Sequence, residues 1–426
     1  MKIGRSVKRF IFNPDLELYS ISQSKILCND SNLSCSVICL CDDSTVVFII
    51  SVDLLWLGNN LNDTILKIIS EEYSVPITNI LLSSTHTHSC PYIDPVVHQN
   101  NISELDNTII DTVLSAVKSA RMLMVKGFID IHYESILNNV NRRKGIVDHD
   151  LLKSFKYVKK IRNRPNAQGH VDNMCLTLIF CEYPKKPIAA VVNYAAHPVL
   201  SPQGKCSADY PGEICKILKE YYNDSNFVTC FLQGFSGNIK PNLWEYSTSI
   251  GSRLSVNLFN FFFDRKHFKK NVNNALINNY ARKIIDKALC SENKERIENI
   301  SISSSIIGVN LELDGNDLSG PVLNLHRIQL SEKLNFIAIN GEVFSEYSTW
   351  MRNRINNDYL VAVSCSGGMI GYLPTAVAID EGGYEIDRCL SIFNQKSRFL
   401  VGIENTIKIS FNKLFNIKPQ QIKTTN

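Results

Sequence analysis

The hydrophobic positions of this chain recur with two periods, and each period predicts one kind of secondary structure. Residues 60–73 and 103–122 carry apolar side chains at intervals of three and four residues, which predicts two amphipathic helices. Ser103 is suited to cap the second helix, and Asp106 favours its first turn. Short apolar runs, often β-branched, predict strands. These lie at residues 36–55 (as a hairpin), 80–82, 127–139, 189–196, 227–232, 301–313, 323–339 (also a hairpin) and 360–364.

Together these elements predict a mixed α/β fold. Strand, helix and strand follow one another in the N-terminal part, which favours β-sheets flanked by α-helices. The stretch 265–299 is rich in Lys, Asn and Glu and predicts mostly amphipathic helix with a solvated face, not a linker. We therefore expect one large domain over residues 1–415 and a polar C-terminal tail at 416–426.

Composition and charge limit the classes of function. The chain of 426 residues is 44% hydrophobic and 20% charged, which is ordinary for a globular protein. Its net charge is +4 with scattered lysines and arginines, so nothing indicates a nucleic-acid partner. The 13 cysteines lack a regular spacing, which predicts free thiols in a reducing compartment and hence the cytoplasm. No stretch has the uninterrupted apolar length of a signal peptide or a transmembrane segment, so we expect neither.

The stretch NILLSSTHTHSCP at residues 79–91 carries the first candidate chemistry. His86 and His88 follow an apolar run, and in an extended backbone side chains two residues apart point to the same side. The pair is therefore a candidate metal site. With 9 histidines in the chain a His-x-His sequence also arises by chance, so further ligands must come from elsewhere.

Three other residues are candidates for the same site, and each also has a simple structural explanation. His197 ends an apolar strand and is either a ligand or a buried histidine satisfied by hydrogen bonds. Glu342 stands at a strand end before a helix and is either a carboxylate ligand or a surface residue at a helix start. Arg142 lies with Arg143 in a predicted loop, where it either clamps an oxygen-rich ligand or is solvated. The residue pattern leaves these alternatives open.

A series of short motifs resembles the neutral/alkaline ceramidase family, specifically its catalytic N-terminal domain. The resemblance runs nearly end to end, and the order and spacing of the motifs carry it. The motifs are STHTHS (84–89), NVNRR (139–143), NYAAHP (193–198), SADYPG (207–212), the loop QGFSGNIKPN (233–242), GE (341–342), GYLPT (371–375) and Tyr384, twelve residues after Tyr372.

The resemblance implies a zinc site. The family's ligands are the first histidine of His-Thr-His, the histidine of His-Pro, the glutamate of Gly-Glu and the tyrosine of the Gly-Tyr loop. These positions correspond to His86, His197, Glu342 and Tyr372. By the same resemblance His88, Arg142 and Tyr384 line the reaction centre, His88 for proton transfer and the other two for the substrate and its developing oxyanion. Zn²⁺ on such ligands activates water for attack on an amide carbonyl.

The chain departs from the family in two respects. Ceramide-cleaving members have Gly-Asp-x-Ser-Pro-Asn where this chain has Asn238 and Lys240 at the Asp and Ser positions, so no serine acts there. Secreted members also carry a signal and a C-terminal immunoglobulin-like domain, which this sequence lacks up to Asn426. We therefore expect an intracellular member whose substrate differs from ceramide in a membrane.

The expected function is a zinc-dependent amidase, an N-deacylase of a ceramide-like lipid or of a soluble N-acyl or N-acetyl compound. The alternatives are a zinc-dependent esterase and a catalytically degenerate, ceramidase-like binding or accessory protein. The convergence of the expected ligands in the fold is the first condition for any of the zinc-dependent activities.

Overall fold

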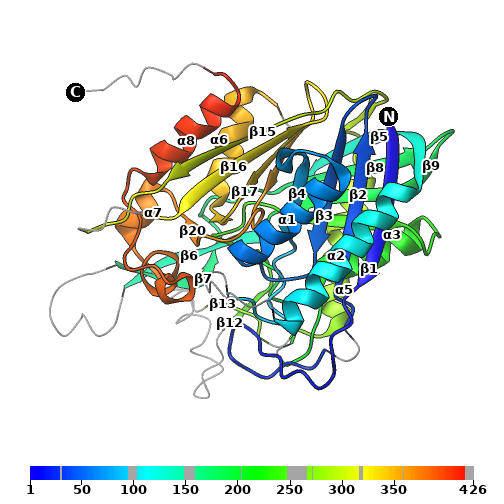
Figure 1. The fold of residues 1–426 in the computed structure, drawn as a ribbon. Helices are drawn as coiled ribbons and strands as arrows, with labels where there is room; N and C mark the ends of the chain where they lie inside the picture. Colours follow the sequence, from blue (N-terminus) through cyan, green and yellow to red (C-terminus); the bar gives the residue numbers. More distant parts are fainter. Residues whose placement is uncertain are drawn as a thin grey trace.

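Within the residues that the structure describes, a nine-stranded sheet is the central element of the fold (Figure 1). The computed structural model describes residues 1–28, 31–94, 103–147, 159–202, 204–246, 266–270, 272–315, 320–357 and 359–417. The strands of this sheet are β1 (Lys2–Arg9), β2 (Ser34–Cys41), β3 (Val46–Val52), β4 (Ile80–Ser84), β5 (Met124–Ser135), β8 (Met174–Glu182), β9 (Lys186–Tyr194), β10 (Val228–Gln233) and β14 (Lys294–Ile297). They follow the order β10-β9-β8-β5-β1-β2-β3-β4, and β14 pairs with β5.

Smaller sheets and helices complete the described part of the chain. The four-stranded sheet has the order β15 (Ser303–Asn310), β16 (Val322–Gln329), β17 (Asn335–Ile339) and β19 (Leu360–Val363). The other strands are β11 (Ile239–Pro241), β6 (Asn139–Val147) and β7 (Lys159–Asn166) in one sheet, β12 (Trp244–Tyr246) with β13 (Lys266–Phe268), and β18 (Glu342–Val343) with β20 (Tyr372–Leu373). The helices are α1 (Asn59–Tyr73), α2 (Glu104–Met122), α3 (Asp209–Tyr221), α5 (Asn274–Leu289), α6 (Ser345–Ile355), α7 (Ala376–Glu381), α8 (Ile403–Leu414) and the short η1 (Ile77–Asn79), η3 (Tyr384–Arg388) and η4 (Leu390–Phe393). None of the helices in the described ranges is long and apolar enough to cross a membrane.

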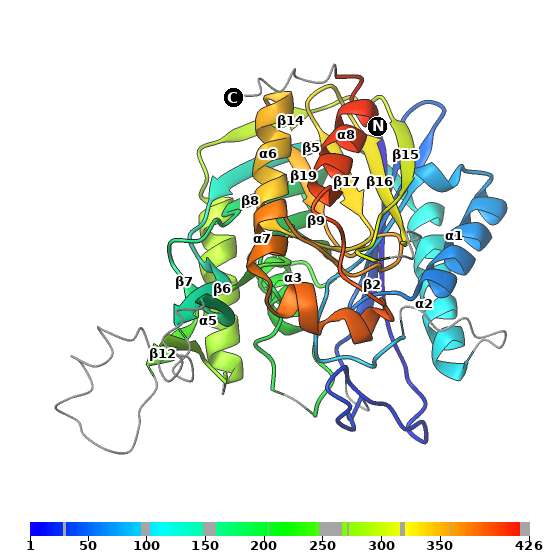
Figure 2. The same ribbon diagram turned by 90° about the vertical axis from the view of Figure 1, so that its left-hand side faces the viewer.

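The central strands β2, β3, β4, β9 and β10 bury both of their faces, and this stacks the fold in layers. On β3, Phe48 packs into a core that includes α1 and α2, whereas its neighbour Ile49 packs into a second core shared with β8, β9 and β10. The hydroxyl of Ser51 on β3 donates a hydrogen bond to the Phe231 carbonyl on β10 at 2.6 Å, so the two halves of the large sheet face one another. A third core joins β8–β10 to α3 and α5. Figure 2 shows α1 and α2 together on one side of these layers.

The carboxyl ends of several strands meet at one place in the fold. The pairs β3–β4, β9–β10 and β17–β19 are parallel, so the residues that follow them emerge at matching edges. The N–H of Ser84 at the end of β4 donates to the Cys365 carbonyl at 3.0 Å, and the N–H of Ser364 donates to the Gln233 carbonyl at the end of β10 at 2.8 Å. These hydrogen bonds bring the segments after β4, β10 and β19 into contact, although they are far apart in the sequence.

The predicted fold class is confirmed, as are most of the predicted elements. The mixed α/β architecture consists of sheets flanked by helices. Helix α2 begins with a capping box in which the Ser103 hydroxyl accepts from the Asp106 N–H and the Asp106 side chain accepts in return. The two predicted hairpins are the antiparallel pairs β2–β3 and β16–β17. The sequence pattern was sufficient for these segments because their apolar side chains form the hydrophobic cores.

Two of the predicted segments differ from the structure. Residues 141–143, predicted as a loop, form part of strand β6 (Asn139–Val147), which pairs with both β7 and β11. Among the described residues of the segment 265–299, Asn274–Leu289 is the helical part, and β13 and β14 flank it. The hydrophobic pattern of the sequence does not predict these short strands, because they are stabilised by pairing with other strands, for example of β14 with β5. The predicted tail at 416–426 lies outside the described residues from 418 onward.

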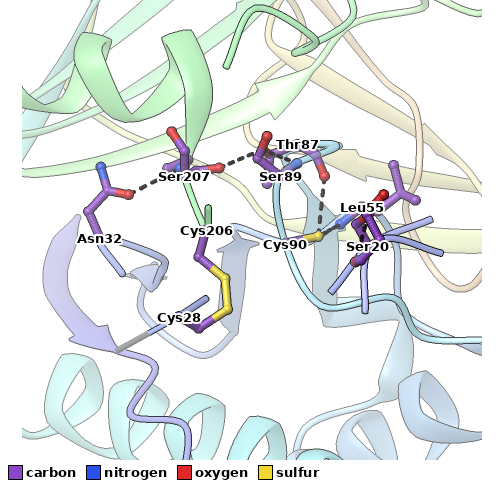
Figure 3. Close-up of a disulfide and its surroundings, with 11 residues drawn as sticks. Ser20, Cys28, Asn32, Leu55, Thr87, Ser89, Cys90, Cys206 and Ser207 are labelled. Atoms are coloured by element: carbon purple, nitrogen blue, oxygen red, sulfur yellow. Dashed lines mark hydrogen bonds between the residues drawn. A yellow bond between two sulfur atoms is a disulfide. The ribbon is translucent and has the colours of Figure 1, made fainter. Parts of the chain in front are cut away.

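A disulfide joins Cys28 in the N-terminal region to Cys206 in the loop before α3 (Figure 3). The prediction of free thiols is wrong for this pair, whereas eleven other cysteines are free. The N–H of the next residue, Ser207, donates a hydrogen bond to the Ser89 carbonyl at 2.7 Å. The Thr87 hydroxyl donates a hydrogen bond to the Ser207 carbonyl at 2.6 Å. The disulfide therefore lies beside the contacts that hold the His-Thr-His segment in place.

Candidate active site

His86 follows strand β4 in an unusual backbone conformation. Its φ is 67°, in the left-handed region, which costs an ordinary residue roughly 1–3 kcal/mol. The prediction of an extended backbone at this position is therefore wrong, because β4 ends at Ser84. The His86 N–H donates to the Leu54 carbonyl at 2.9 Å, and the ring Nδ1–H donates to the Leu55 carbonyl at 2.9 Å. These bonds fix the buried ring with Nε2 directed away from them.

His197 is held in the same manner on the opposite side of the site. It follows β9, is buried, and its Nδ1 lies 2.8 Å from the Ser236 carbonyl and 3.1 Å from the Ile239 carbonyl. Its Nε2 lies 3.1 Å from Oε2 of Glu342. Because Nδ1–H donates to backbone carbonyls, Nε2 is left as the acceptor or ligand atom.

Glu342 reaches this point from β18, where it pairs in parallel with Tyr372 on β20. Gly237 makes the approach possible, because a Cβ at this residue would lie 2.5 Å from the Glu342 carbonyl oxygen. Its N–H donates to the Val343 carbonyl at 2.8 Å, which ties the loop after β10 to β18. The structure thus brings together three of the expected ligands, His86, His197 and Glu342, and places Tyr372 beside them.

The electrostatics of this cluster favour a cation among the three side chains. Oε2 of Glu342 lies 3.3 Å from Nε2 of His86, which has no hydrogen-bond partner of acceptable geometry. Burial raises the pKa of Glu342, but the charge of His86 outweighs burial and holds this pKa well below its usual value. Burial lowers the pKa of His86, but the charges of Cys365 and Glu342 outweigh burial and raise this pKa well above its usual value. Burial and the charge of Arg142 lower the pKa of His197 to about 3, so its imidazole is neutral. An ionised carboxylate, a neutral imidazole and a second imidazole that would lose its Nε2 proton on metal binding are a set of donors that suits Zn²⁺.

Arg142 is a buried residue of strand β6 that contacts this cluster. Its Nη1 lies 3.4 Å from Nε2 of His197, and its Nη2 donates to the Gly237 carbonyl at 2.7 Å and to the Tyr372 hydroxyl at 3.1 Å. Its Nε donates to Oε1 of Glu385 at 2.8 Å. The alternative of a solvated basic loop is therefore wrong. Burial raises the pKa of Tyr372 well above its usual value, and the charge of Glu342 raises it further.

His88 and Tyr384 lie on the open side of the cluster. The His88 ring centroid lies 5.1 Å from that of His86 and 5.7 Å from that of His197. The ring nitrogens of these three histidines lie within 4.8 Å of one another, so His88 also belongs to a group that can hold a metal. The expectation that separates His88 from the ligands rests on the resemblance alone. The ring of Tyr384 lies 6.0 Å from that of Tyr372.

Comparison with solved structures places this arrangement in a known fold. The chain superposes on the crystal structure of neutral ceramidase from Pseudomonas aeruginosa with a TM-score of 0.70 and 13% identity, covering 98% of this chain and 75% of that one. A ceramidase complexed with C2 matches with a TM-score of 0.70 and 13% identity over 99% of this chain and 76% of that one. The chain has the neutral ceramidase fold. No protein-family model matches the sequence, and no curated protein matches it.

Two residues that depart from the ceramidase motif have different surroundings in this fold. Asn238 is buried and structural: its Oδ1 accepts the Ser345 N–H at 2.9 Å and its Nδ2 donates to Oε2 of Glu346 at 2.8 Å. Lys240 is only partly buried and lines a cavity. The Ser-to-Lys departure therefore alters the surface of the cavity, whereas the Asp-to-Asn departure lies in the packing behind it.

This cavity of the ceramidase-like fold reaches the candidate site. Its volume is about 1150 Å³, and His88 and Tyr384 line its wall. His86, His197 and Glu342 lie buried behind His88. A small-molecule site of this size holds a drug-sized or lipid-like ligand. The cavity therefore gives a substrate a route to the cluster.

Sequence reasoning missed two residues that contact the predicted ones. Glu385 accepts from Arg142 and, through Oε2 at 2.7 Å, from Nη1 of Arg143. Sγ of Cys365 lies 3.4 Å from Nδ1 of His86. The only signal for Glu385 is its place directly after Tyr384, and no signal in the sequence indicates Cys365.

Proposed function

We propose that this protein is a zinc-dependent amidase that hydrolyses the amide bond of an N-acylated substrate. The observation that carries the proposal is the convergence of His86 Nε2 and His197 Nε2 on Oε2 of Glu342, at 3.3 and 3.1 Å, next to a large cavity. The neutral ceramidase fold of the chain supports the same class of reaction.

His86, His197, Glu342 and Tyr372 would hold the metal. The two imidazoles offer Nε2 because backbone carbonyls engage Nδ1, and the carboxylate is ionised. The Tyr372 oxygen accepts a hydrogen bond from Arg142, and the charge of Arg142 opposes the rise that burial causes in the pKa of this phenol. When bound, Zn²⁺ supplies Lewis-acid polarisation of a carbonyl and lowers the pKa of water.

His88 is the proposed proton-transfer group. Its Nε2 has no hydrogen-bond partner, it lines the cavity, and burial together with the charge of His86 keeps its pKa well below the usual value. A neutral imidazole accepts a proton from the attacking water as the new C–O bond forms. The imidazolium then returns this proton to the amide nitrogen as the C–N bond breaks, which yields a carboxylic acid and an amine.

Tyr384 and Arg142 have different proposed tasks at the developing oxyanion. Burial raises the pKa of Tyr384 to about 12, so its phenol keeps the proton that it can donate to an oxyanion in the cavity. Arg142 is already engaged by Glu385, Gly237 and Tyr372. We therefore assign Arg142 to positioning Tyr372 and to the positive field of the site, and the direct contact to Tyr384.

The substrate class is a ceramide-like lipid or a soluble N-acyl compound, and an ester substrate is the alternative within the hydrolases. A catalytically degenerate binding protein is a second candidate, which is favoured by Lys240 at the position of the family's serine. The cytoplasmic location likewise remains a prediction from the composition.

The decisive experiment combines metal analysis with a panel of N-acyl and O-acyl compounds. We expect about one Zn²⁺ per chain and release of the amine that stops on chelation and resumes on adding zinc. Faster cleavage of the O-acyl compounds would indicate an esterase. Bound zinc without release from any compound would favour the binding protein.

A further inference from the structure

Lys240 places a positive charge in the cavity close to the reaction centre. It lies on β11, which pairs with β6 so that Lys240 is opposite Val140. Arg142, two residues further along β6, contacts the candidate metal ligand His197. Lys240 and Tyr384 line the same cavity as His88. A substrate bound at His88 therefore shares this cavity with the Lys240 ammonium.

This ammonium forms no ion pair with a described residue. Its Nζ lies 5.0 Å from the centroid of the Phe268 ring, a cation-π contact, and it is not within ion-pair distance of a carboxylate in the described ranges. Glu385, the nearby acid, is engaged by both Arg142 and Arg143 at 2.8 and 2.7 Å. A partly buried cation without a counter-ion is unfavourable by itself, and a ligand that brings an anion relieves this cost.

The other charged residues of the cavity wall have the same sign of charge. Besides Lys240, Lys269 and Lys270 line it, and none of the described lining residues is acidic. Low-dielectric walls with one sign of charge concentrate the field and attract ligands of the opposite sign. Apolar side chains such as Ile26 and Val199 line other parts of the wall, so the cavity also has room for an acyl chain.

We propose that the substrate carries an oxyanion, a carboxylate or a phosphate, on the amine side of the scissile amide, and that Lys240 is the residue that selects it. This inference rests on the proposed amidase function, since it names the substrate class of the same site. A charge-assisted hydrogen bond from Lys240 to the oxyanion, strengthened by the basic wall, orients the amide toward His88.

Three compounds with the same lauroyl chain test the proposal: N-lauroylethanolamine, which is neutral, N-lauroylglycine, and N-lauroylphosphoethanolamine. We expect kcat/KM of the zinc-loaded protein to be at least about 10-fold higher for one of the anionic compounds than for the neutral one. The Lys240→Met variant should lose most of this preference, roughly 10- to 100-fold, and Lys240→Arg should keep part of it. The better of the two anions identifies the carboxylate or the phosphate.

Lys266→Met is the matched control, because Lys266 lies on β13 with its Nζ 4.7 Å from the Trp244 ring and does not line the cavity. It should leave the preference unchanged. An equal or lower kcat/KM for both anionic compounds, or a preference that survives Lys240→Met, would overturn the anion site while leaving the amidase intact.

Equilibrium binding by calorimetry answers the same question if no compound is hydrolysed. Tighter binding of an anionic compound that Lys240→Met weakens would support the anion site and contradict the amidase function. Binding of the neutral compound as tightly as both anions, or binding of none of the three, would overturn the anion site.

Discussion

Nε2 of His197 lies 3.1 Å from Oε2 of Glu342, 145 residues further along the chain. Both side chains are buried, and His86 approaches the same oxygen at 3.3 Å. The hydrogen bonds of both imidazoles to backbone carbonyls fix their orientation before any ligand arrives. A preorganised cluster of this kind is expected to bind a metal without rearrangement.

Replacing the carboxylate should therefore remove the metal. We expect Glu342→Gln to weaken zinc binding by more than the roughly 10- to 100-fold that is typical for losing a residue that hydrogen-bonds to a metal ligand, because it removes a charged ligand. Zinc content after dialysis measures the effect. Glu346→Gln is a nearby control, since Glu346 contacts Asn238 and not the cluster. Equal zinc retention in the two variants would exclude Glu342 as a ligand.

His88→Gln separates proton transfer from metal binding. If His88 only moves the proton, the variant should keep its zinc and lose roughly 100- to 10,000-fold in kcat. The alternative is that His88 is itself a metal ligand, which the geometry allows because His88 lies in one group with His86 and His197. Loss of zinc from His88→Gln would make His88 a ligand. His132→Gln, on β5, is the control and should change neither quantity.

The ion pair of Arg142 with Glu385 should contribute to stability as well as to the site. Removing one partner of a buried ion pair leaves an uncompensated charge, so Glu385→Gln is expected to lower the free energy of unfolding by roughly 3–5 kcal/mol. The exposed pair of Arg282 with Glu220 is the comparison, and Glu220→Gln should cost less than about 1 kcal/mol. Urea unfolding measures both. Equal, small losses would mean that Glu385 is not the main counter-ion.

Asp53 should make the stability depend on pH. It is buried, accepts hydrogen bonds from Ser34 at 2.9 Å, and burial raises its pKa to about 6. A carboxyl whose pKa is higher in the folded than in the unfolded state contributes stability below the unfolded pKa and loses it as the pH rises through 6. Relative to Asp53→Asn, the wild type should therefore gain up to roughly 3 kcal/mol between pH 7 and pH 4. Unfolding curves of both proteins across this range would show no relative change if Asp53 titrated normally.

The helices and most strands were predictable because they bury one continuous apolar pattern. Strand β8 was also predictable, since its sequence MCLTLIFCE is typical of a buried strand, but it was not among the predicted strands. Strand β6 was not predictable, because Asn141, Arg142 and Arg143 are typical of a loop and become strand only through pairing with β7 and β11.

The site shows a similar division. Local motifs and the family resemblance identified the residues that the fold brings together, but not how it holds them. The left-handed backbone of His86 depends on tertiary hydrogen bonds to Leu54 and Leu55, which no local pattern records. Glu385 becomes a partner of Arg142 only when segments 243 residues apart meet. The disulfide between Cys28 and Cys206 is of the same kind, because the sequence spacing of the cysteines does not indicate which pair is adjacent.

The most direct test of the central claim is a zinc titration of the metal-free protein with hydrolysis of an N-acyl substrate as the readout. We predict that activity rises in proportion to added Zn²⁺ and levels off at about one ion per chain, and that a variant lacking His86 and His197 shows no rise. Full amide hydrolysis by the metal-free protein, or a zinc-dependent rise that persists in that variant, would contradict the proposed centre.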